Sequence, residues 1–379
     1  MNFQLKPRPH IRNNTGKEQS GNTEMLNVVT IALLFVAAWA IGSRYVLFGP
    51  AVAIHIVLMI VTAVVAGLFA HTIFYLFMDG LEKVKFASFG ERLKSTWPRT
   101  MAGAPFVTAL IIALGTQPRI PLYVVAVAVI ITEIFVKLVF GGFGQNLFNP
   151  AAFAFLFIAL SFGNTTIETW YLPDTITSAT PLAGLNRMNW LMTAEEAYHF
   201  VRTSGGFGRM LMGNVPGAVA ETSRLAILIA FVYMAWKKAL DWVLPVFYVG
   251  TVFLITLIYG LIIGAGILYP LIHILTGGII FGAVFMATDP VTTPINRQGK
   301  AIWAILLGMF TLLIRFTANH AEGVAFSLLL MNILVPIIDS RTANITIADT
   351  SKKIMSIVIA FVASAVIVIG LTMLINAFA

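Results

Sequence analysis

Residues 51–78 read AVAIHIVLMIVTAVVAGLFAHTIFYLFM, and this stretch decides the class of the fold. It carries no Lys, Arg, Asp or Glu, and about 20 consecutive apolar residues allow a helix to cross a hydrocarbon core roughly 30 Å thick. The whole chain of 379 residues is 59% hydrophobic and 11% charged, which lies outside the usage of soluble globular proteins. We therefore predict an all-α fold, a polytopic integral membrane helical bundle.

Similar apolar runs recur along the whole chain. Some are long enough to span the bilayer alone, and others are short enough to be tilted, broken or paired. From their number and lengths we expect about 10–11 transmembrane helices. The runs cover residues 26–43, 51–78, 101–116, 121–140, 149–163, 223–236, 240–264, 267–288, 301–317, 323–338 and 354–378.

The placement of Lys and Arg predicts how the chain sits in the membrane. Most of them fall in alternate connections, such as residues 79–100, and in the polar arm 1–25. Cytoplasmic connections carry this excess of Lys and Arg. We therefore place the chain in the cell inner (cytoplasmic) membrane, with its N terminus in the cytoplasm. The arm has no apolar stretch, and we expect no cleavable signal peptide. Residues 26–379 form one integral domain, with the polar loop at about 164–222 on the outer face.

Composition also limits the chemistry of the chain. It contains no Cys, which excludes disulfides and thiolate-ligated iron–sulfur clusters within it, so electron transfer would need a flavin, a haem or a quinone. His71 and His273 from different helices are an alternative as haem ligands. The net charge of +8 lies in the connections, and we expect no nucleic acid partner. We assign no metal-binding and no catalytic residue.

The loop at residues 174–182, DTITSATPL, holds the first motif with chemical potential. Ser/Thr-rich loops that end in Pro are also ordinary turns. The stretch resembles the flavin-attachment motif of the RnfD/NqrB family, the membrane subunits of ion-pumping redox complexes. The resemblance implies that Thr180 carries covalent FMN through a phosphoester, with Asp174 and Ser178 at the same site. Thr175 and Ser178 replace two glycines of the family pattern.

Residues 141–150, GGFGQNLFNP, form the second motif, between two apolar runs. One interpretation is a helix break capped by Asn before Pro, because glycines permit tight backbone and Asn amides both donate and accept. The run also resembles the most recognisable sequence of the same family. That resemblance implies that Asn146 and Asn149 contact non-covalent riboflavin, and it extends to Gly141, Gly142 and Lys137.

Four carboxylates within or beside apolar runs are candidates for an ion path: Glu133, Glu221, Asp289 and Asp339. Ionisable groups in membrane segments usually face the protein interior or a water path. Glu133 stands four residues before Lys137, so the two can meet on one helical face as a structural ion pair. Glu221 can equally compensate a helix N-terminus, and Asp289 before Pro can end a helix.

These motifs occur in the family's order between about residues 120 and 340, whereas the run 354–378 is an extra terminal helix. The resemblance, closest to RnfD, implies an electron-transfer subunit of an Rnf-type complex that couples ferredoxin oxidation and NAD reduction to Na⁺ or H⁺ transport. It implies iron–sulfur subunits, a second flavin subunit and a flavin transferase as partners. An NqrB-type subunit of the Na⁺-translocating NADH:quinone reductase is one alternative. A channel or transporter without a redox cofactor is another.

Overall fold

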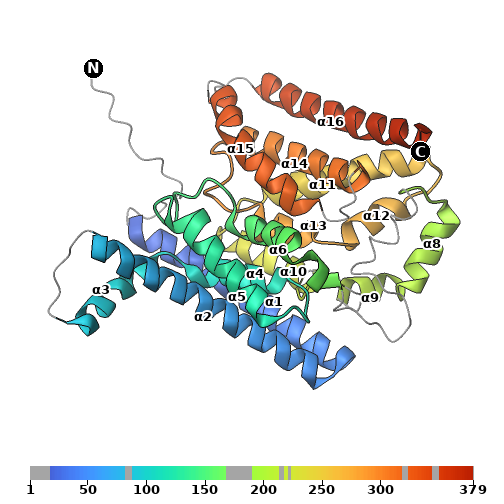
Figure 1. Cartoon of the computed structure of the whole chain (residues 1–379). Helices are drawn as coiled ribbons and strands as arrows, with labels where there is room; N and C mark the ends of the chain where they lie inside the picture. Colours follow the sequence, from blue (N-terminus) through green and yellow to red (C-terminus); the bar gives the residue numbers. More distant parts are fainter. Residues whose placement is uncertain are drawn as a thin grey trace, which may run out of the picture.

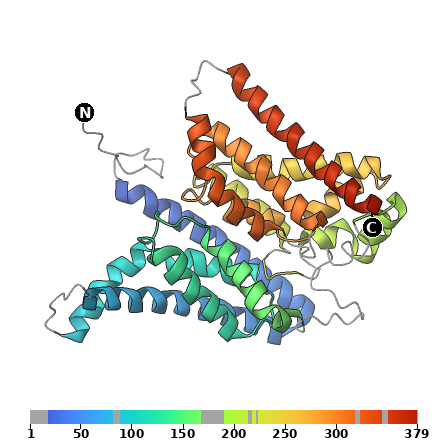
Figure 2. The same ribbon diagram turned by 45° about the horizontal axis from the view of Figure 1, so that its top comes forward.

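The computed structural model describes residues 18–81, 88–167, 190–212, 217–220, 223–317, 323–343 and 350–378. Within these ranges every regular element is a helix and there is no strand. The all-α prediction is therefore confirmed. The chain forms two groups of long helices, which Figure 2 shows side by side.

The first group is built from the N-terminal half of the chain, coloured blue to green in Figure 1. Helix α2 packs against α1, α3, α4, α5 and η1. The elements are α1 (Glu18–Phe48), α2 (Pro50–Leu81), α3 (Phe89–Ala102), α4 (Pro105–Gly115), α5 (Leu122–Ile131), the π-helix η1 (Thr132–Leu138) and α6 (Pro150–Ile167).

The second group comes from the C-terminal half, with α14 packed between α11, α15 and α16. Two short helices, α8 (Ala194–Thr203) and α9 (Gly206–Met212), precede it. The two groups meet where α1 packs on α10 and where α6 packs on α15. The second group comprises α10 (Arg224–Trp236), α11 (Val243–Ile262), α12 (Leu268–Leu275), α13 (Ile279–Phe281), the π-helix η2 (Gly282–Met286), α14 (Arg297–Thr317), α15 (Val324–Thr342) and α16 (Thr350–Phe378).

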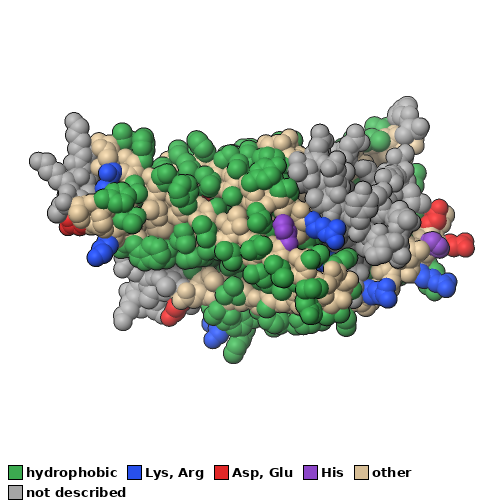
Figure 3. All heavy atoms as spheres, turned by 60° about the horizontal axis from the view of Figure 1, so that its bottom comes forward, with side chains coloured by type: hydrophobic (Ala, Val, Ile, Leu, Met, Phe, Trp, Pro, Cys, Tyr) green, Lys and Arg blue, Asp and Glu red, His purple; other side chains and the backbone are tan. Residues whose placement is uncertain are grey.

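The surface has the distribution expected of a membrane protein. Hydrophobic side chains cover the middle of the face in Figure 3, and most visible charged side chains lie toward its two ends. Within the described residues, six helices are long and apolar enough to cross a membrane, or up to eight if each bent pair is one span. The shorter apolar helices α6 and α10 and the joined α5 and η1 account for the remaining predicted runs, so 10–11 spans stays a prediction.

Two predicted runs are broken rather than straight. Helices α3 and α4 are bent by 60°, and α12 and the segment Ile279–Met286 by 65°. At the first break Pro105 lacks a backbone N–H and Ala104 has a φ of 47°, which together end α3. At the second, Gly277 has a φ of 75°, a conformation that glycine adopts without a steric penalty.

The connection predicted at residues 79–100 is largely helical, which the sequence interpretation missed. Helix α3 begins after Ser88, whose side chain accepts a hydrogen bond from the Glu91 N–H, and this is a standard helix cap. Its other end is held by Arg99, which donates two hydrogen bonds to the Asp79 carboxylate at 2.9 and 2.7 Å. The predicted extra terminal helix is confirmed as α16, which packs against α14.

Candidate functional site

The second sequence motif forms a tight loop after η1. Gly141, Gly142 and Gly144 have φ values of +112°, +92° and +93°, a region that residues with a Cβ rarely adopt. The Gly142 N–H donates to the Lys137 carbonyl at 2.9 Å and closes the π-helix. Asn146 and Asn149 follow in this loop and lie at the boundary between the two helix groups.

Asn149 connects the two halves of the chain. Its Oδ1 accepts the Ala152 N–H at 3.0 Å and caps α6, while its Nδ2 donates to the Met286 carbonyl at 2.9 Å. Its backbone N–H donates to Asn332 Oδ1 at 2.8 Å, and Asn332 Nδ2 in turn donates to the Thr292 carbonyl at 3.0 Å. The predicted helix cap is present, and the same amide fixes the loop to η2.

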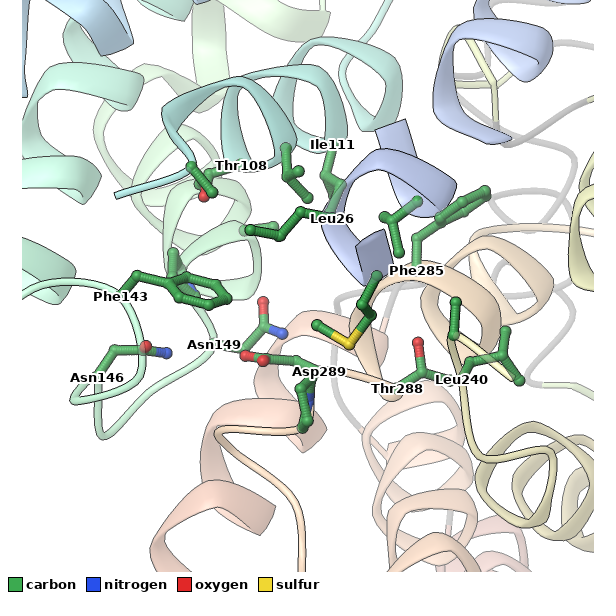
Figure 4. Close-up of a pocket in the computed structure, with 18 of the residues that line it drawn as sticks. Leu26, Thr108, Ile111, Phe143, Asn146, Asn149, Leu240, Phe285, Thr288 and Asp289 are labelled. Carbon is green, nitrogen blue, oxygen red and sulfur yellow. The ribbon is translucent and has the colours of Figure 1, made fainter. Parts of the chain in front are cut away.

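A pocket lies where these segments meet (Figure 4). The space between its lining atoms is about 780 Å³, with the open solvent at its mouth included. Asn149 and Asp289 lie across it from Leu26 and Ile111. The apolar lining includes Leu26, Val107, Ile111, Phe143, Leu240 and Phe285. The polar lining includes Thr108, Lys137, Asn146, Asn149, Thr288 and Asp289.

Asp289 belongs to the turn that follows η2. Its Oδ1 accepts the Val291 N–H and its Oδ2 accepts the Thr292 hydroxyl, each at 3.1 Å, so the predicted helix-terminating turn is present. Burial raises the pKa of this carboxyl above its ordinary value, against the two hydrogen bonds and the nearby charge of Lys137, which lower it. The turn therefore brings a half-buried acid to the pocket.

The predicted pair of Glu133 and Lys137 is confirmed. Lys137 Nζ lies 3.1 Å from Glu133 Oε2, and it also donates to Thr108 Oγ1 at 3.0 Å. Glu133 has a second partner that the sequence interpretation missed, because His71 Nε2 lies 2.7 Å from the same oxygen. This bond gives His71 a carboxylate partner. The two residues are 62 positions apart, so no local spacing in the sequence could have indicated this bond.

The remaining predicted site residues fall elsewhere. Asp339 Oδ1 accepts the Ile295 N–H at 2.9 Å, so it supports the segment that follows the Asp289 turn. Thr180, Asp174, Ser178 and Glu221 lie outside the described residues. Of the predicted set, the pocket thus brings together Lys137, Asn146, Asn149 and Asp289 from both halves of the chain.

The lining combines apolar walls with one polar side. The apolar side chains come from α1, α4, η2 and the segment after α10, while amides, a hydroxyl and a carboxyl gather beside the two loops. Asn146 Nδ2 donates to the Phe148 carbonyl at 3.1 Å, which fixes the amide in place. Small-molecule sites have this composition, with apolar walls and a few placed polar groups.

Comparison with known proteins gives a consistent set of relatives. The model of the NQR2, RnfD, RnfE family matches residues 4–348. A subunit of the proton-translocating ferredoxin:NAD(+) oxidoreductase complex of Clostridium ljungdahlii is 35% identical over 249 residues, which are 63% of this chain and 73% of that protein. A subunit of the Na(+)-translocating ferredoxin:NAD(+) oxidoreductase complex of Acetobacterium woodii is 35% identical over 239 residues, 62% of this chain and 70% of that protein. A subunit of the ion-translocating oxidoreductase complex of Actinobacillus pleuropneumoniae serotype 3 is 28% identical over 310 residues, 73% of this chain and 86% of that protein.

Proposed function

This chain belongs to the NQR2, RnfD, RnfE family, and from that premise we propose that it conducts electrons across the membrane between two flavins. It is a multi-pass membrane subunit of an ion-translocating oxidoreductase complex. In this proposal ferredoxin supplies the electrons and NAD receives them, as in the names of the two relatives with 35% identity. The chain has no Cys, so partner subunits carry the iron–sulfur clusters.

The pocket between the two halves is the proposed riboflavin site, and it is the observation that carries the proposal. Its apolar walls would contact the ring system, and the amide donors and acceptors on its polar side support this placement. Asn146 and Asn149 would hold the polar edge of the ring, with Gly141 and Gly142 shaping the loop. The bound flavin would supply the electron-accepting chemistry that these side chains lack.

The second proposed flavin is an FMN joined to Thr180 by a phosphoester. The loop sequence around Thr180, with Asp174 and Ser178, supports this, and a flavin transferase would make the link. The excess of Lys and Arg in alternate connections supports an orientation with this loop on the outer face of the inner membrane and the N terminus in the cytoplasm. Electrons would then pass between a pocket nearer the inside and an FMN outside.

The coupling ion is left open by the relatives, since one of the two with 35% identity is named proton-translocating and the other Na(+)-translocating. Glu133, Glu221, Asp289 and Asp339 remain the proposed residues of the ion path. Of these, Glu133 and Asp289 lie at or beside the pocket. Buried carboxylates in membrane segments are typical of such paths.

The test is the flavin content of the purified complex. We expect Asn146→Ala to remove most of the acid-extractable riboflavin, with the covalent FMN retained. The matched control is Asn296→Ala, because Asn296 caps α14 through the Gly299 N–H at 2.6 Å and does not line the pocket. Unchanged riboflavin in Asn146→Ala would contradict the placement.

A separate experiment tests the covalent flavin. In cells that make the flavin transferase, the denatured subunit should fluoresce in a gel under ultraviolet light. Thr180→Ala should abolish this signal, and Thr177→Ala serves as a hydroxyl control in the same loop. A wild-type subunit without fluorescence and without extractable riboflavin would contradict the redox function and favour a transporter without cofactor.

A further inference from the structure

A line of polar side chains leads from the pocket into the first helix group. His71, Tyr75 and Asp79 follow one another at intervals of four on α2, so they share one face of that helix. This face is directed toward η1 and α3, where it meets Glu133 and Arg99 respectively. At the pocket end, Lys137 belongs to both the line and the pocket lining.

The inner part of this line is a buried cluster of three ionisable groups. His71, Glu133 and Lys137 are at most 2% exposed. Glu133 Oε2 is shared by His71 Nε2 at 2.7 Å and Lys137 Nζ at 3.1 Å. An ion pair of Glu133 and Lys137 alone would already be electrically neutral. His71 adds a third ionisable group that charge balance between the other two does not require.

The two ring nitrogens of His71 have different surroundings. Nε2 is bonded to Glu133, whereas Nδ1 is buried and has no hydrogen-bond partner among the described residues. Gly103, at the bend between α3 and α4, lies against this edge, and a Cβ there would overlap the ring. The bend thus leaves space for the imidazole in the core. One nitrogen is engaged and the other is free to accept a proton.

The outer part of the line reaches the exposed end of α3. The Tyr75 ring lies edge-on to His71, with centroids 6.2 Å apart. The Arg99 guanidinium sits 4.9 Å from the centre of the Tyr75 ring and is paired with Asp79. The Arg99 side chain is 39% exposed. The line therefore runs from the partly exposed Arg99 to groups that are fully buried.

The π-helical turn gives the cluster its position. Residues 132–138 widen to i→i+5 hydrogen bonds, such as Val139 N–H to the Ile134 carbonyl at 2.9 Å. Insertions of this kind are frequent at functional sites. Here the widened turn directs Glu133 toward His71 and Lys137 toward the pocket, where the charge of Lys137 also acts on Asp289.

We propose that His71, Glu133 and Lys137 form a proton relay that supplies the flavin pocket. The inference rests on the proposed riboflavin, since an isoalloxazine takes up protons when electrons from ferredoxin reduce it. It holds whichever ion the complex transports. The surface at α3 is the side from which protons enter, and the pocket is where they leave.

The relay balances at each step. Lys137 gives one Nζ proton to an acceptor in the pocket and becomes a neutral amine. Glu133, protonated at Oε2 by His71 Nε2–H, passes that proton to Nζ and returns to its carboxylate. His71 takes up a proton at Nδ1 from the α3 side as it releases its Nε2 proton, and a reorientation of the ring then presents the remaining N–H to Glu133 for the next cycle. One proton enters and one leaves per cycle, and the relay itself transfers no electrons.

The experiment uses the purified complex, reduced with ferredoxin in a stopped-flow instrument. Flavin absorbance reports reduction, and a pH-indicator dye reports proton uptake. His71→Gln keeps a side chain that can bond to Glu133 but does not relay protons, and Glu133→Gln removes the carboxylate. We expect each variant to slow proton uptake by at least about ten-fold, with riboflavin content unchanged. His273→Gln is the matched control, since His273 is also fully buried and does not line the pocket.

The outcomes separate this inference from the proposed function. Riboflavin absent from the wild type would overturn the proposed function and the relay with it. Riboflavin present with wild-type uptake in both variants would overturn only the relay and leave a structural ion pair. If either variant loses its flavin, the infrared difference spectrum of the wild type on reduction distinguishes the relay from a purely structural ion pair. A carboxyl band that Glu133→Asp shifts supports the relay, and a spectrum with no carboxyl band overturns it.

Discussion

The two halves of the chain use the same backbone device with different chemistry. Each carries a π-helical segment that leads into a loop at the pocket, η1 before residues 141–149 and η2 before residues 287–296. Segment η1 contains Glu133 and Lys137, both buried, whereas η2 is the wholly apolar run GAVFM. The first half therefore supplies charge to the pocket and the second supplies an apolar wall, with Asp289 added by the turn. Backbone shape alone does not define what such a segment does.

Removing the shared carboxylate should have the largest effect on stability. Glu133→Leu leaves Lys137 charged and buried without its acid, and loss of one partner of a buried pair costs about 3–5 kcal/mol. The corresponding change in η2, Met286→Leu, conserves volume and should cost less than about 1.5 kcal/mol. Thermal unfolding of the purified complex in detergent measures both. Equal losses in the two variants would show that the charge of η1 is not what distinguishes the halves.

Substitution at the junction between the two halves should give the second-largest loss of stability. Asn332→Leu leaves the Asn149 N–H and the Thr292 carbonyl without the partner they have now, at about 1–3 kcal/mol for a buried unsatisfied group. Asn332 does not line the pocket. The binding of riboflavin should therefore weaken because the loop is displaced, and not because a direct contact is lost. Equilibrium dialysis of riboflavin measures this, and binding equal to wild type would contradict a coupled junction.

Substitution of glycine by alanine should destabilise the two regions for different reasons. Gly144 has a positive φ and open space around its Cβ position, so Gly144→Ala should cost about 1–2 kcal/mol from backbone strain alone. In η2 a Cβ on Gly282 would meet Val324 Cγ1 at 2.5 Å. Gly282→Ala should therefore be rescued by Val324→Ala. Thermal unfolding of the single and double variants tests this, and a double variant no more stable than Gly282→Ala would refute the steric explanation.

The smallest expected effect is a difference in pH dependence between two acids. Burial raises the pKa of Asp241, but the hydrogen bond and charge of Lys300 outweigh it and hold that pKa below the ordinary value. Asp241 therefore contributes stability above its unfolded pKa, and this is lost as pH falls through its folded pKa. The pKa of Asp289 is raised, so its contribution to stability changes with pH in the opposite direction. That contribution is present in acid and is lost as pH rises through the pKa of the folded state.

Comparison of Asp241→Asn and Asp289→Asn across pH measures this difference. Relative to wild type, Asp241→Asn should lose stability at neutral pH and recover it in acid. Asp289→Asn should lose less stability, relative to wild type, at neutral pH than in acid. The exposed share of the Asp241 pair limits its effect to about 1 kcal/mol. Parallel curves for the two variants would refute the opposite shifts.

Several features of the site follow from the sequence, and others do not. The spacing of Glu133 and Lys137 predicts their contact because both lie on one helix. The GGFG run predicts a loop with positive φ because only glycine occupies that region freely. His71 as a partner of Glu133 was missed, since a bond between two helices depends on how they pack and leaves no local pattern. The flavin link at Thr180 stays a prediction outside the described residues.

The linear chain is enough to identify a helical membrane protein and its family, because apolar length and motif order are local properties of the sequence. The meeting of Asp289 with Asn146 and Asn149 in one pocket, and the bond from Asn332 to the loop, depend on how the helices pack. The reason is physical. Periodicity specifies which face of a helix is apolar, whereas the bends at Gly103 and Gly277 and the packing of η1 and η2 determine which faces meet.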